Sequence, residues 1–198
     1  RVMAKDAVDL VAAKLPQRVP ESVTHVTPLV GAPGYAGMWN QRERIARDHD
    51  LPVQRVEHLL QRYGVLARDL LDLMRERPEL REPIDGADAY LRAEAWYAAS
   101  HEGALHLEDT LTRRTRISIE TFDRGLRAAR DVVHWMGEVL GWDDATRRGE
   151  HEQYDDRGGG ERQSQEQPDD LTADAARLGA PDVRTQGRDG GAEIVRIK

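Results

Sequence analysis

Residues 56–64 read Val-Glu-His-Leu-Leu-Gln-Arg-Tyr-Gly, and this stretch decides the fold class. Four apolar side chains share the three- and four-residue spacing of one helical face: Val56, Leu59, Leu60 and Tyr63. Pro52 stands near the first turn and Gly64 follows the last, as is common at the two ends of a helix. The stretch therefore predicts an amphipathic helix that turns one face toward a core.

The same spacing recurs along the chain and predicts further helices. The apolar stripes run from Val8 to Leu15, Leu66 to Met74, Tyr90 to Ala99, Leu105 to Arg114 and Leu126 to Leu140. Pro16, Pro78 and Gly141 mark ends of these stripes. A short polar helix capped by Asp143 is expected after the last of them. The pattern predicts an all-α fold of about six helices with a disordered C-terminal tail.

Composition bounds the class of protein. The 198 residues correspond to one domain with an appendage, at roughly 150 residues per domain. The net charge of −7 repels phosphate backbones, and no basic recognition helix is present, so nucleic-acid binding is not expected. The absence of cysteine removes disulfides, thiolate chemistry and iron–sulfur clusters. No apolar run approaches the roughly 20 residues that span a bilayer.

Changes in composition divide the chain into four parts. Residues 1–18 form a helix without a cap before it, which suggests a piece of something longer, and residues 19–37 form an irregular connection rich in proline and glycine. Residues 38–156 form the helical domain, because the aromatic side chains gather there. Residues 157–198 contain no aromatic residue and are expected to be a mostly disordered tail.

Two weak elements are expected within that tail. Residues 170–178 have the spacing of a short helix, and residues 194–197 could form a short strand if given a partner.

Two motifs that suggest ligand binding are rejected on spacing. The glycines at 31, 34 and 37 do not match the G-x-G-x-x-G pattern that lets backbone approach a pyrophosphate. His101 and His106 are five positions apart, so on a regular helix they point about 140° apart and cannot share a metal ion. We instead expect a helix to end at Gly103, with His101 near the helix carbonyls and Glu102 paired with an arginine.

Arg113-Arg114-Thr115-Arg116 is the densest positive cluster in the chain and follows Glu108-Asp109. Guanidinium groups can hold a phosphate or a carboxylate through two hydrogen bonds. The cluster could therefore bind an anion, or it could form an ion-paired interface with another domain or with the acidic residues nearby. Trp96, Tyr97 and Trp135 lie at helical spacing and are interpreted as core. No nucleophile elbow of the form G-x-S-x-G is present, so the residues alone predict no catalytic site.

The order of several motifs resembles the C-terminal part of the FAD-dependent (aerobic) glycerol-3-phosphate dehydrogenases. The resemblance covers about residues 1–155 and rests on segments beginning at Arg1, His58, Tyr90, Leu107 and Met136. These segments read Arg-Val-Met-Ala-Lys-Asp-Ala-Val-Asp, His-Leu-Leu-Gln-Arg-Tyr-Gly, Tyr-Leu-Arg-Ala-Glu-Ala-Trp-Tyr running on to Ser100-His-Glu102, Leu-Glu-Asp-Thr-Leu-Thr-Arg-Arg-Thr and Met-Gly-Glu-Val-Leu-Gly-Trp.

The resemblance implies that the chain is a helical cap, with residues 1–18 continuing from a flavin-binding domain that is missing here. In the family, the whole enzyme oxidises glycerol-3-phosphate to dihydroxyacetone phosphate with FAD and passes the electrons to a quinone. Its members are cytoplasmic and typically peripheral to the membrane, and a homodimer is compatible with this reading. The glycine fingerprint for FAD and the family's active-site lysine are absent, so the chain alone is not expected to be catalytic.

The resemblance also suggests which residues contact the flavin-binding domain or the substrate. The candidates are charged side chains within the motif segments: Arg1, His101, Glu102, Arg113 and Arg114. No residue is assigned a catalytic role, and no cofactor or metal ligand is assigned to this chain.

A rival interpretation needs no flavin partner. The chain could be a stand-alone helical interaction or dimerisation module that shares the fold of the cap without enzymatic activity. A start codon directly before the Arg1 codon would favour this module.

Overall fold

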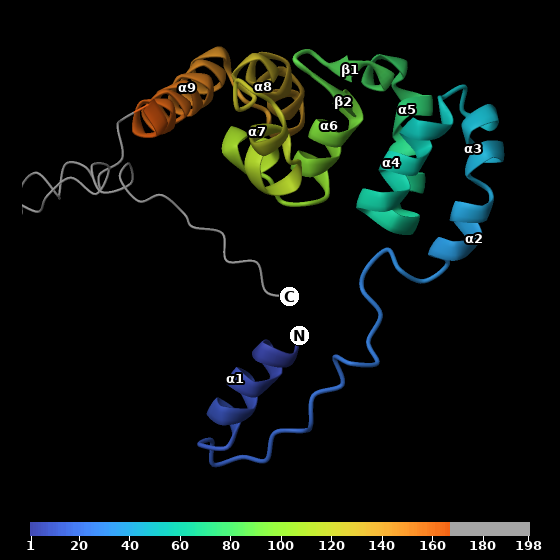
Figure 1. Cartoon of the computed structure of the whole chain (residues 1–198), viewed down its shortest axis with the longest axis vertical. Coiled ribbons are helices and arrows are strands. Elements are labelled where there is room, and N and C mark those ends of the chain that lie inside the picture. The colour runs from blue at the N-terminus through green and yellow to red at the C-terminus, as the bar shows by residue number, and fades with distance from the viewer. Residues whose placement is uncertain (167–198) are drawn as a thin grey trace, which may run out of the picture. The chain divides into compact units, whose positions relative to one another are not determined.

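A computed structural model describes the backbone of residues 1–166 and the side chains of residues 1–157. Most of the described chain is helical, as the apolar spacing predicts (Figure 1). The helices are α1 (Val2–Ala12), α2 (Tyr35–Asn40), α3 (Arg42–Asp48), α4 (Val53–Tyr63), α5 (Ala67–Glu76), α6 (Arg92–Ser100), α7 (Ile117–Glu120), α8 (Leu126–Leu140) and α9 (Asp144–Glu166). Two 3₁₀ turns, η1 (Gly64–Leu66) and η2 (Pro78–Arg81), and a π-helix, η3 (Asp109–Arg114), complete the helical elements.

The chain divides into two compact units. The first comprises residues 1–84 and 88–103, and the second comprises residues 85–87 and those from Ala104 onward. In the first unit, α4 and α5 lie side by side and bury the apolar faces that their sequences predict. Its fully buried side chains include Val56, Leu59, Leu60, Leu70, Met74 and Leu80.

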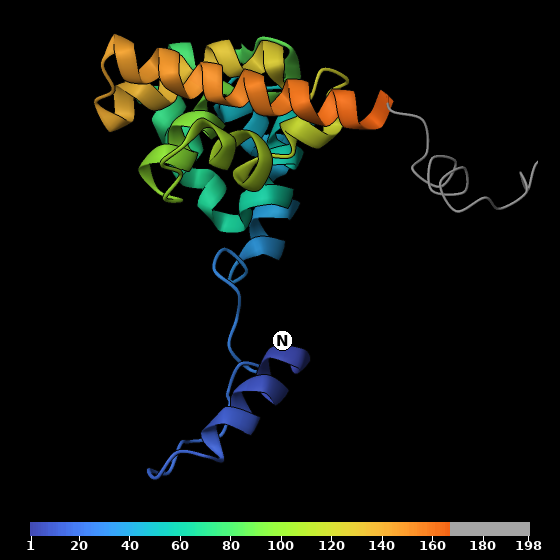
Figure 2. The ribbon, with the colours of Figure 1, turned by 90° about the vertical axis from the view of Figure 1, so that its left-hand side faces the viewer.

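The second unit is built around α8. This helix buries seven residues, including Val132, Trp135 and Met136. Figure 2 shows the length of α9, which packs beside α8 after the turn at Gly141. The Asp143 carboxylate accepts a hydrogen bond of 2.8 Å from the Thr146 N–H, so the predicted cap is confirmed.

A two-stranded sheet interrupts the helices, and here the prediction of a helix from Tyr90 was wrong. β1 (Pro83–Ile84) pairs with β2 (Ala87–Leu91), and α6 begins only at Arg92. Asp85-Gly86 forms the turn between the strands, with Gly86 at φ +80°. Gly86 is the one residue of this turn with positive φ, a conformation that glycine adopts without a steric cost.

Other boundaries also differ from the prediction, and α1 ends at Ala12 rather than at Leu15. The irregular connection was predicted to run to residue 37, but α2 already begins at Tyr35. Neither α2 nor α3 was predicted. The helix expected over residues 105–114 begins at Leu107 and continues as the π-helix η3. The polar helix after Asp143 is long rather than short, and it runs past residue 157 to Glu166. Because helix extension is cooperative, the first half of α9, which packs on α8, allows the helix to continue into a glycine-rich stretch.

Several predictions concern side chains or the tail. Tyr97 and Trp135 are buried as expected, whereas Trp96 is half-buried beneath the Arg77 guanidinium, 4.2 Å from its ring centroid. Phe122 is fully exposed. The helix expected at 170–178 and the strand at 194–197 lie outside the described residues. In the described part, no helix is both long enough and apolar enough to cross a membrane.

Gly64 connects α4 to η1 in a conformation that requires glycine. Its φ and ψ are 60° and −133°, and a Cβ there would lie 2.2 Å from the Gly31 carbonyl oxygen. The same carbonyl accepts a hydrogen bond of 2.9 Å from the Val65 N–H. A close backbone contact at Gly31 therefore holds the loop before α2 against the end of α4.

Gly64→Ala is expected to lower the free energy of unfolding by about 3 kcal/mol or more, because it adds a steric clash to backbone strain. Gly141→Ala is the matched control, since Gly141 also has positive φ but a Cβ there meets nothing within 4 Å. The control should cost only about 1–2 kcal/mol. Urea unfolding followed by circular dichroism measures both, and equal losses would contradict the role given to the Gly31 contact.

Candidate functional site

Glu94 is a fully buried carboxylate in the first turn of α6. Its helix neighbours Ala93 and Ala95 are also fully buried, so the carboxylate stands in an apolar layer. One of its oxygens accepts a hydrogen bond of 3.0 Å from the Leu91 N–H, directly before the helix. This is the way an acidic residue at the third helical position satisfies a free backbone donor.

The remaining partners of Glu94 come from α4. The His58 Nε2 lies 3.1 Å from both carboxylate oxygens, and the Tyr63 hydroxyl donates a hydrogen bond of 3.1 Å. The Arg62 Nε lies 3.7 Å from the same carboxylate. His58 and Arg62 lie one turn apart on the same face of α4, whereas Tyr63 lies about 100° further around the helix and reaches the carboxylate from the side. A buried carboxylate is tolerated because opposite charge and donors surround it.

The Tyr90 ring completes this cluster. The His58 ring meets it edge-on with a centroid distance of 5.2 Å, and the Arg62 guanidinium lies 5.2 Å from its centroid. The cluster of His58, Arg62, Tyr63, Tyr90 and Glu94 is called the Glu94 cluster below. It joins the segment that begins at His58 to the segment that begins at Tyr90.

Burial raises the pKa of the Tyr63 hydroxyl well above its usual value, and the nearby charge of Glu94 adds to this shift. The hydroxyl therefore keeps its proton and remains a donor to the carboxylate. Burial alone would lower the pKa of Arg62, but Tyr63, Tyr90 and Glu94 outweigh this effect and raise it. The cluster is a charge-paired fastening between α4 and α6, and its chemistry does not by itself indicate a catalytic centre.

The structure places three of the five predicted site residues in the first unit. The Arg1 guanidinium donates hydrogen bonds to the carbonyls of Thr24 and Thr27. His101 follows the last residue of α6 and stacks on Tyr97 with a centroid distance of 4.5 Å. The helix therefore ends at Ser100, three residues before the predicted end at Gly103, although His101 does lie at the helix carbonyls, as expected.

Glu102 is half-buried after α6, and its charge contributes to the raised pKa of both Tyr63 and Tyr97. Burial is the main cause of the shift at Tyr97, whose pKa is raised to about 12, and the Asp69 carboxylate that accepts its hydrogen bond adds to it. Glu102 therefore belongs to the tyrosine-rich surroundings of the Glu94 cluster.

Arg113 and Arg114, the other two predicted residues, lie at the end of η3 in the second unit. Arg113 bonds to the Asp109 carboxylate at 2.5 Å and to the Glu108 carboxylate at 3.2 Å. Arg113 is thus ion-paired with two acidic residues of its own unit. Arg114 is exposed. The five predicted residues are therefore divided between the two units.

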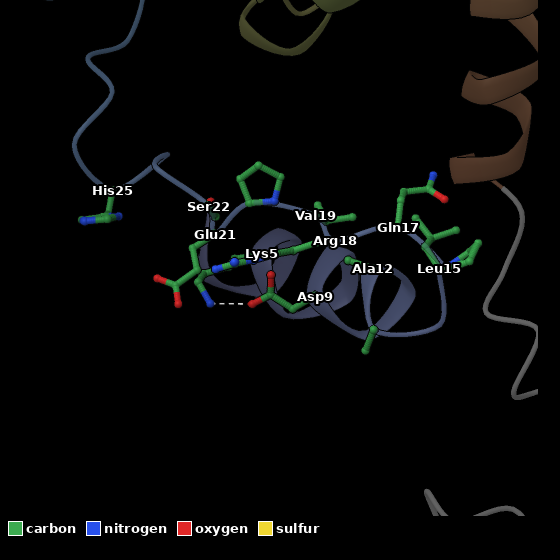
Figure 3. A pocket seen from close by; sticks show the side chains of 13 residues that line it. Lys5, Asp9, Ala12, Leu15, Gln17, Arg18, Val19, Glu21, Ser22 and His25 are labelled. Atoms are coloured by element: carbon green, nitrogen blue, oxygen red, sulfur yellow. Dashed lines mark hydrogen bonds and ion pairs between the residues drawn. The ribbon is translucent and has the colours of Figure 1, made fainter.

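Several hollows lie outside the Glu94 cluster in the described part of the chain, and two of them adjoin α1 and η3. One is formed by α1 and the residues that follow it, and Figure 3 shows Lys5 and Asp9 of α1 joined across it by an ion pair of 2.5 Å. The other, in the second unit, has a volume of about 280 Å³ and is lined by His106, Glu108, Arg113, Glu150, Gln153, Tyr154 and Arg157. Within residues 1–157, no group of three or more histidine or acidic side chains is arranged to hold a metal ion.

The Glu94 cluster was missed at the sequence level. A single acidic residue in the alanine-rich run of α6 was a usable signal, because an uncompensated carboxylate is not tolerated on a buried face. Its partners could not be assigned, since the sequence does not show that α4 and α6 approach each other.

Comparison with known proteins identifies relatives over most of the chain. Residues 22–147 match the family model described as the C-terminal domain of alpha-glycerophosphate oxidase. The glycerol-3-phosphate dehydrogenase of Mycobacterium leprae is 47% identical over 186 residues, which cover 94% of this chain and 32% of that protein. Glycerol-3-phosphate dehydrogenase 2 of Mycobacterium tuberculosis is 46% identical over the same shares.

A more distant relative is the probable mitochondrial glycerol-3-phosphate dehydrogenase of Dictyostelium discoideum. It is 30% identical over 151 residues, which cover 76% of this chain and 23% of that protein. No solved structure matches. The chain thus spans about a third of the length of the mycobacterial relatives.

Glu94→Ala is expected to lower the free energy of unfolding by about 3–5 kcal/mol, because it leaves buried donors and a cation without their acceptor. Glu94→Gln keeps an acceptor for the Leu91 N–H and should cost less. Glu120→Ala is the control, since Glu120 forms an exposed i,i+4 pair with Arg116 at 3.6 Å, worth at most about 0.5 kcal/mol. Urea unfolding measures all three. A Glu94→Ala variant as stable as the control would show that the cluster does not hold the unit together.

Proposed function

The chain belongs to the family of the C-terminal domain of alpha-glycerophosphate oxidase, and from this premise we propose that it serves an enzyme that oxidises glycerol-3-phosphate to dihydroxyacetone phosphate. The observation that carries the proposal is the match at 46–47% identity over 94% of the chain to proteins named glycerol-3-phosphate dehydrogenase. In this reaction the substrate's secondary alcohol loses a hydride and a proton and becomes a ketone. The hydride would need an acceptor such as FAD, and a quinone would serve as the final electron acceptor; both lie outside this chain's own residues.

The described residues do not fit a flavin site. Their sheet has two short strands, and the glycine-rich loop between α1 and α2 lacks the spacing that a strand–turn–helix dinucleotide site requires. We therefore assign the flavin and the substrate to the part of the enzyme that this chain does not span. This chain supplies a helical domain and by itself catalyses nothing.

Helix α1 supports an attachment to that other part. Fourteen large hydrophobic side chains are exposed in the described part of the chain, and eleven of them lie between residues 2 and 30. The helix itself buries no residue. Lys5, Asp6 and Asp9 occupy a strip about 100° wide, and the apolar side chains other than Val2 occupy an arc of about 200°. Such a wide apolar face is typical of a helix that is buried on most sides.

We propose that the flavin-binding part of the same enzyme covers the apolar face of α1. The five charged residues predicted for docking, Arg1, His101, Glu102, Arg113 and Arg114, remain our candidates for polar contacts with that part or with the substrate. We place the whole enzyme in the cytoplasm at the membrane surface, where a quinone acceptor is reached. This placement follows from the proposed reaction.

A chimaera tests the proposed function. The C-terminal third of the Mycobacterium leprae relative is replaced by this chain, and reduction of a dye by glycerol-3-phosphate is compared with that of the parent and of a truncated protein. The chimaera is expected to keep FAD and most of the parent's activity, whereas truncation should abolish it, because the domain completes the fold of the enzyme.

A chimaera that retains FAD but is no more active than the truncated protein would contradict the proposal. If the chimaera does not fold, the chain is added in trans to the truncated protein and binding is measured by calorimetry. Binding with recovered dye reduction supports the proposal, and absence of binding contradicts it and favours the stand-alone module.

Val11→Asp tests the role of α1. In the isolated chain it should leave the unfolding midpoint unchanged, because Val11 is 61% exposed. In the chimaera it should lower the melting temperature by several degrees and weaken FAD retention, because it buries a charge. Asp9→Asn on the polar strip is the matched control and should change neither. Equal melting temperatures for the chimaera with and without Val11→Asp would show that α1 is not covered.

A further inference from the structure

Helix α9 docks on the second unit through polar contacts. Among its 14 described side chains, only Tyr154 is buried, whereas α8 buries seven of its 15 residues. The apolar contribution to the docking of α9 is therefore limited to roughly the 2–3 kcal/mol of one buried aromatic side chain. The polar contacts add to this contribution, and their loss favours release of α9.

These contacts form one stripe along α9. The Glu150 carboxylate accepts hydrogen bonds of 2.8 Å from the Leu107 N–H and from the Nδ1 of His106. One turn later the Tyr154 hydroxyl donates a hydrogen bond of 2.7 Å to the Arg124 carbonyl. Arg157 continues the stripe and forms an ion pair with Glu108.

The stripe crosses the segment that leads into the π-helix η3. Leu107 and Glu108 form the helical turn directly before η3, and the Arg113 guanidinium of η3 shares the Glu108 carboxylate with Arg157. The cavity of about 280 Å³ described above lies between α9 and this segment. π-Helices are rare and often occur where function requires an irregular helix. Release of α9 would open this cavity on one side.

We propose that α9 is a releasable strap over the η3 segment, held down by the pair of His106 and Glu150 while His106 is protonated and loosened when His106 loses its proton.

The charges around His106 come from three elements. Glu150 of α9 faces its ring directly, Asp109 and Arg113 belong to η3, and Glu108 and Arg157 line the same cavity. The hydrogen bond with Glu150 raises the pKa of His106 above its usual value of 6.5, with a further contribution from the charge of Glu150. A group with a raised pKa in the docked state stabilises docking fully below its undocked pKa. That contribution disappears as the pH rises through the raised value, so α9 opens more readily at higher pH.

A higher salt concentration, like a higher pH, is expected to loosen the docking of α9. The side chain of His106 is 67% exposed and that of Arg157 is 50% exposed, so dissolved ions screen both pairs. The size of the pH effect is limited for the same reason, to the range of an exposed ion pair.

Hydrogen exchange at the Leu107 amide tests the strap, because this N–H is bonded to Glu150 and becomes free when α9 leaves. The exchange rate is measured by NMR on the 198-residue chain at about pH 6 and about pH 8 and divided by the intrinsic rate at each pH. We expect protection to fall about two- to fivefold between the two pH values. Protection of the amides of α8 should change less, since α8 remains in place.

Two variants identify the group responsible. His106→Gln removes the titrating ring, and Glu150→Gln keeps an acceptor for the Leu107 N–H but removes the charge, so both should make Leu107 protection independent of pH. His134→Gln is the matched control, because His134 pairs with Glu138 at 3.3 Å within α8 and bridges no elements. It should keep the pH dependence of the parent chain.

Constant Leu107 protection in the parent chain overturns the proposal, as does a pH dependence that survives both variants. A fall of equal size at Leu107 and throughout α8 also overturns it, because that result indicates unfolding of the whole unit. If one variant does not fold, the other variant and the parent chain give the answer.

Discussion

A carboxylate with no exposed surface must be surrounded by donors or positive charge, and the packing of the first unit depends on how Glu94 meets this requirement. Its partners come from α4 and from the residue directly before α6, so a shift of one helix along the other would break these contacts. The apolar contacts of α4 and α5 could tolerate small shifts. The hydrogen bonds to Glu94 cannot, because their geometry is directional.

The two units use different kinds of contact. The first combines an apolar core with the Glu94 cluster, and the second combines the apolar face of α8 with the polar face of α9. Helix α1 follows neither plan, since its apolar side chains are exposed. The proposed attachment to a larger enzyme predicts such a face, and the chain spans about a third of the length of its Mycobacterium leprae relative. The exposed α1 and the family match therefore support the same proposal from independent observations.

Much of the helical fold could be predicted because amphipathic spacing is a local signal. The stripes of α4, α5 and α8 are buried on the predicted faces, and the Asp143 cap forms. The hairpin was also signalled locally by Asp85-Gly86, but the apolar residues that follow were interpreted as a helix. The π-helix could not be predicted, because the hydrogen bond from the Thr115 N–H to the Thr110 carbonyl depends on tertiary packing.

Long-range pairing limits what a sequence shows about the candidate site. Glu94 stands 36 positions from His58 and 31 from Tyr63, and Glu150 stands 44 positions from His106. Spacing along the chain carries no information about such contacts. Of the predicted site residues, Arg113 is joined to Glu108 and Asp109, and both of these lie within five positions of it. Local charge pairing was therefore predictable, and the distant partners of Glu94 and His106 were not.

The central claim of this account is that Glu94 fastens α4 to α6 through specific hydrogen bonds. A double-mutant cycle with Tyr63→Phe and Glu94→Gln tests it most directly, because it isolates the energy of that pair from the effect of each substitution alone. The account predicts a coupling energy of about 1–3 kcal/mol in urea unfolding. Losses that add to within about 0.3 kcal/mol would show that the two groups do not interact, which would contradict the account.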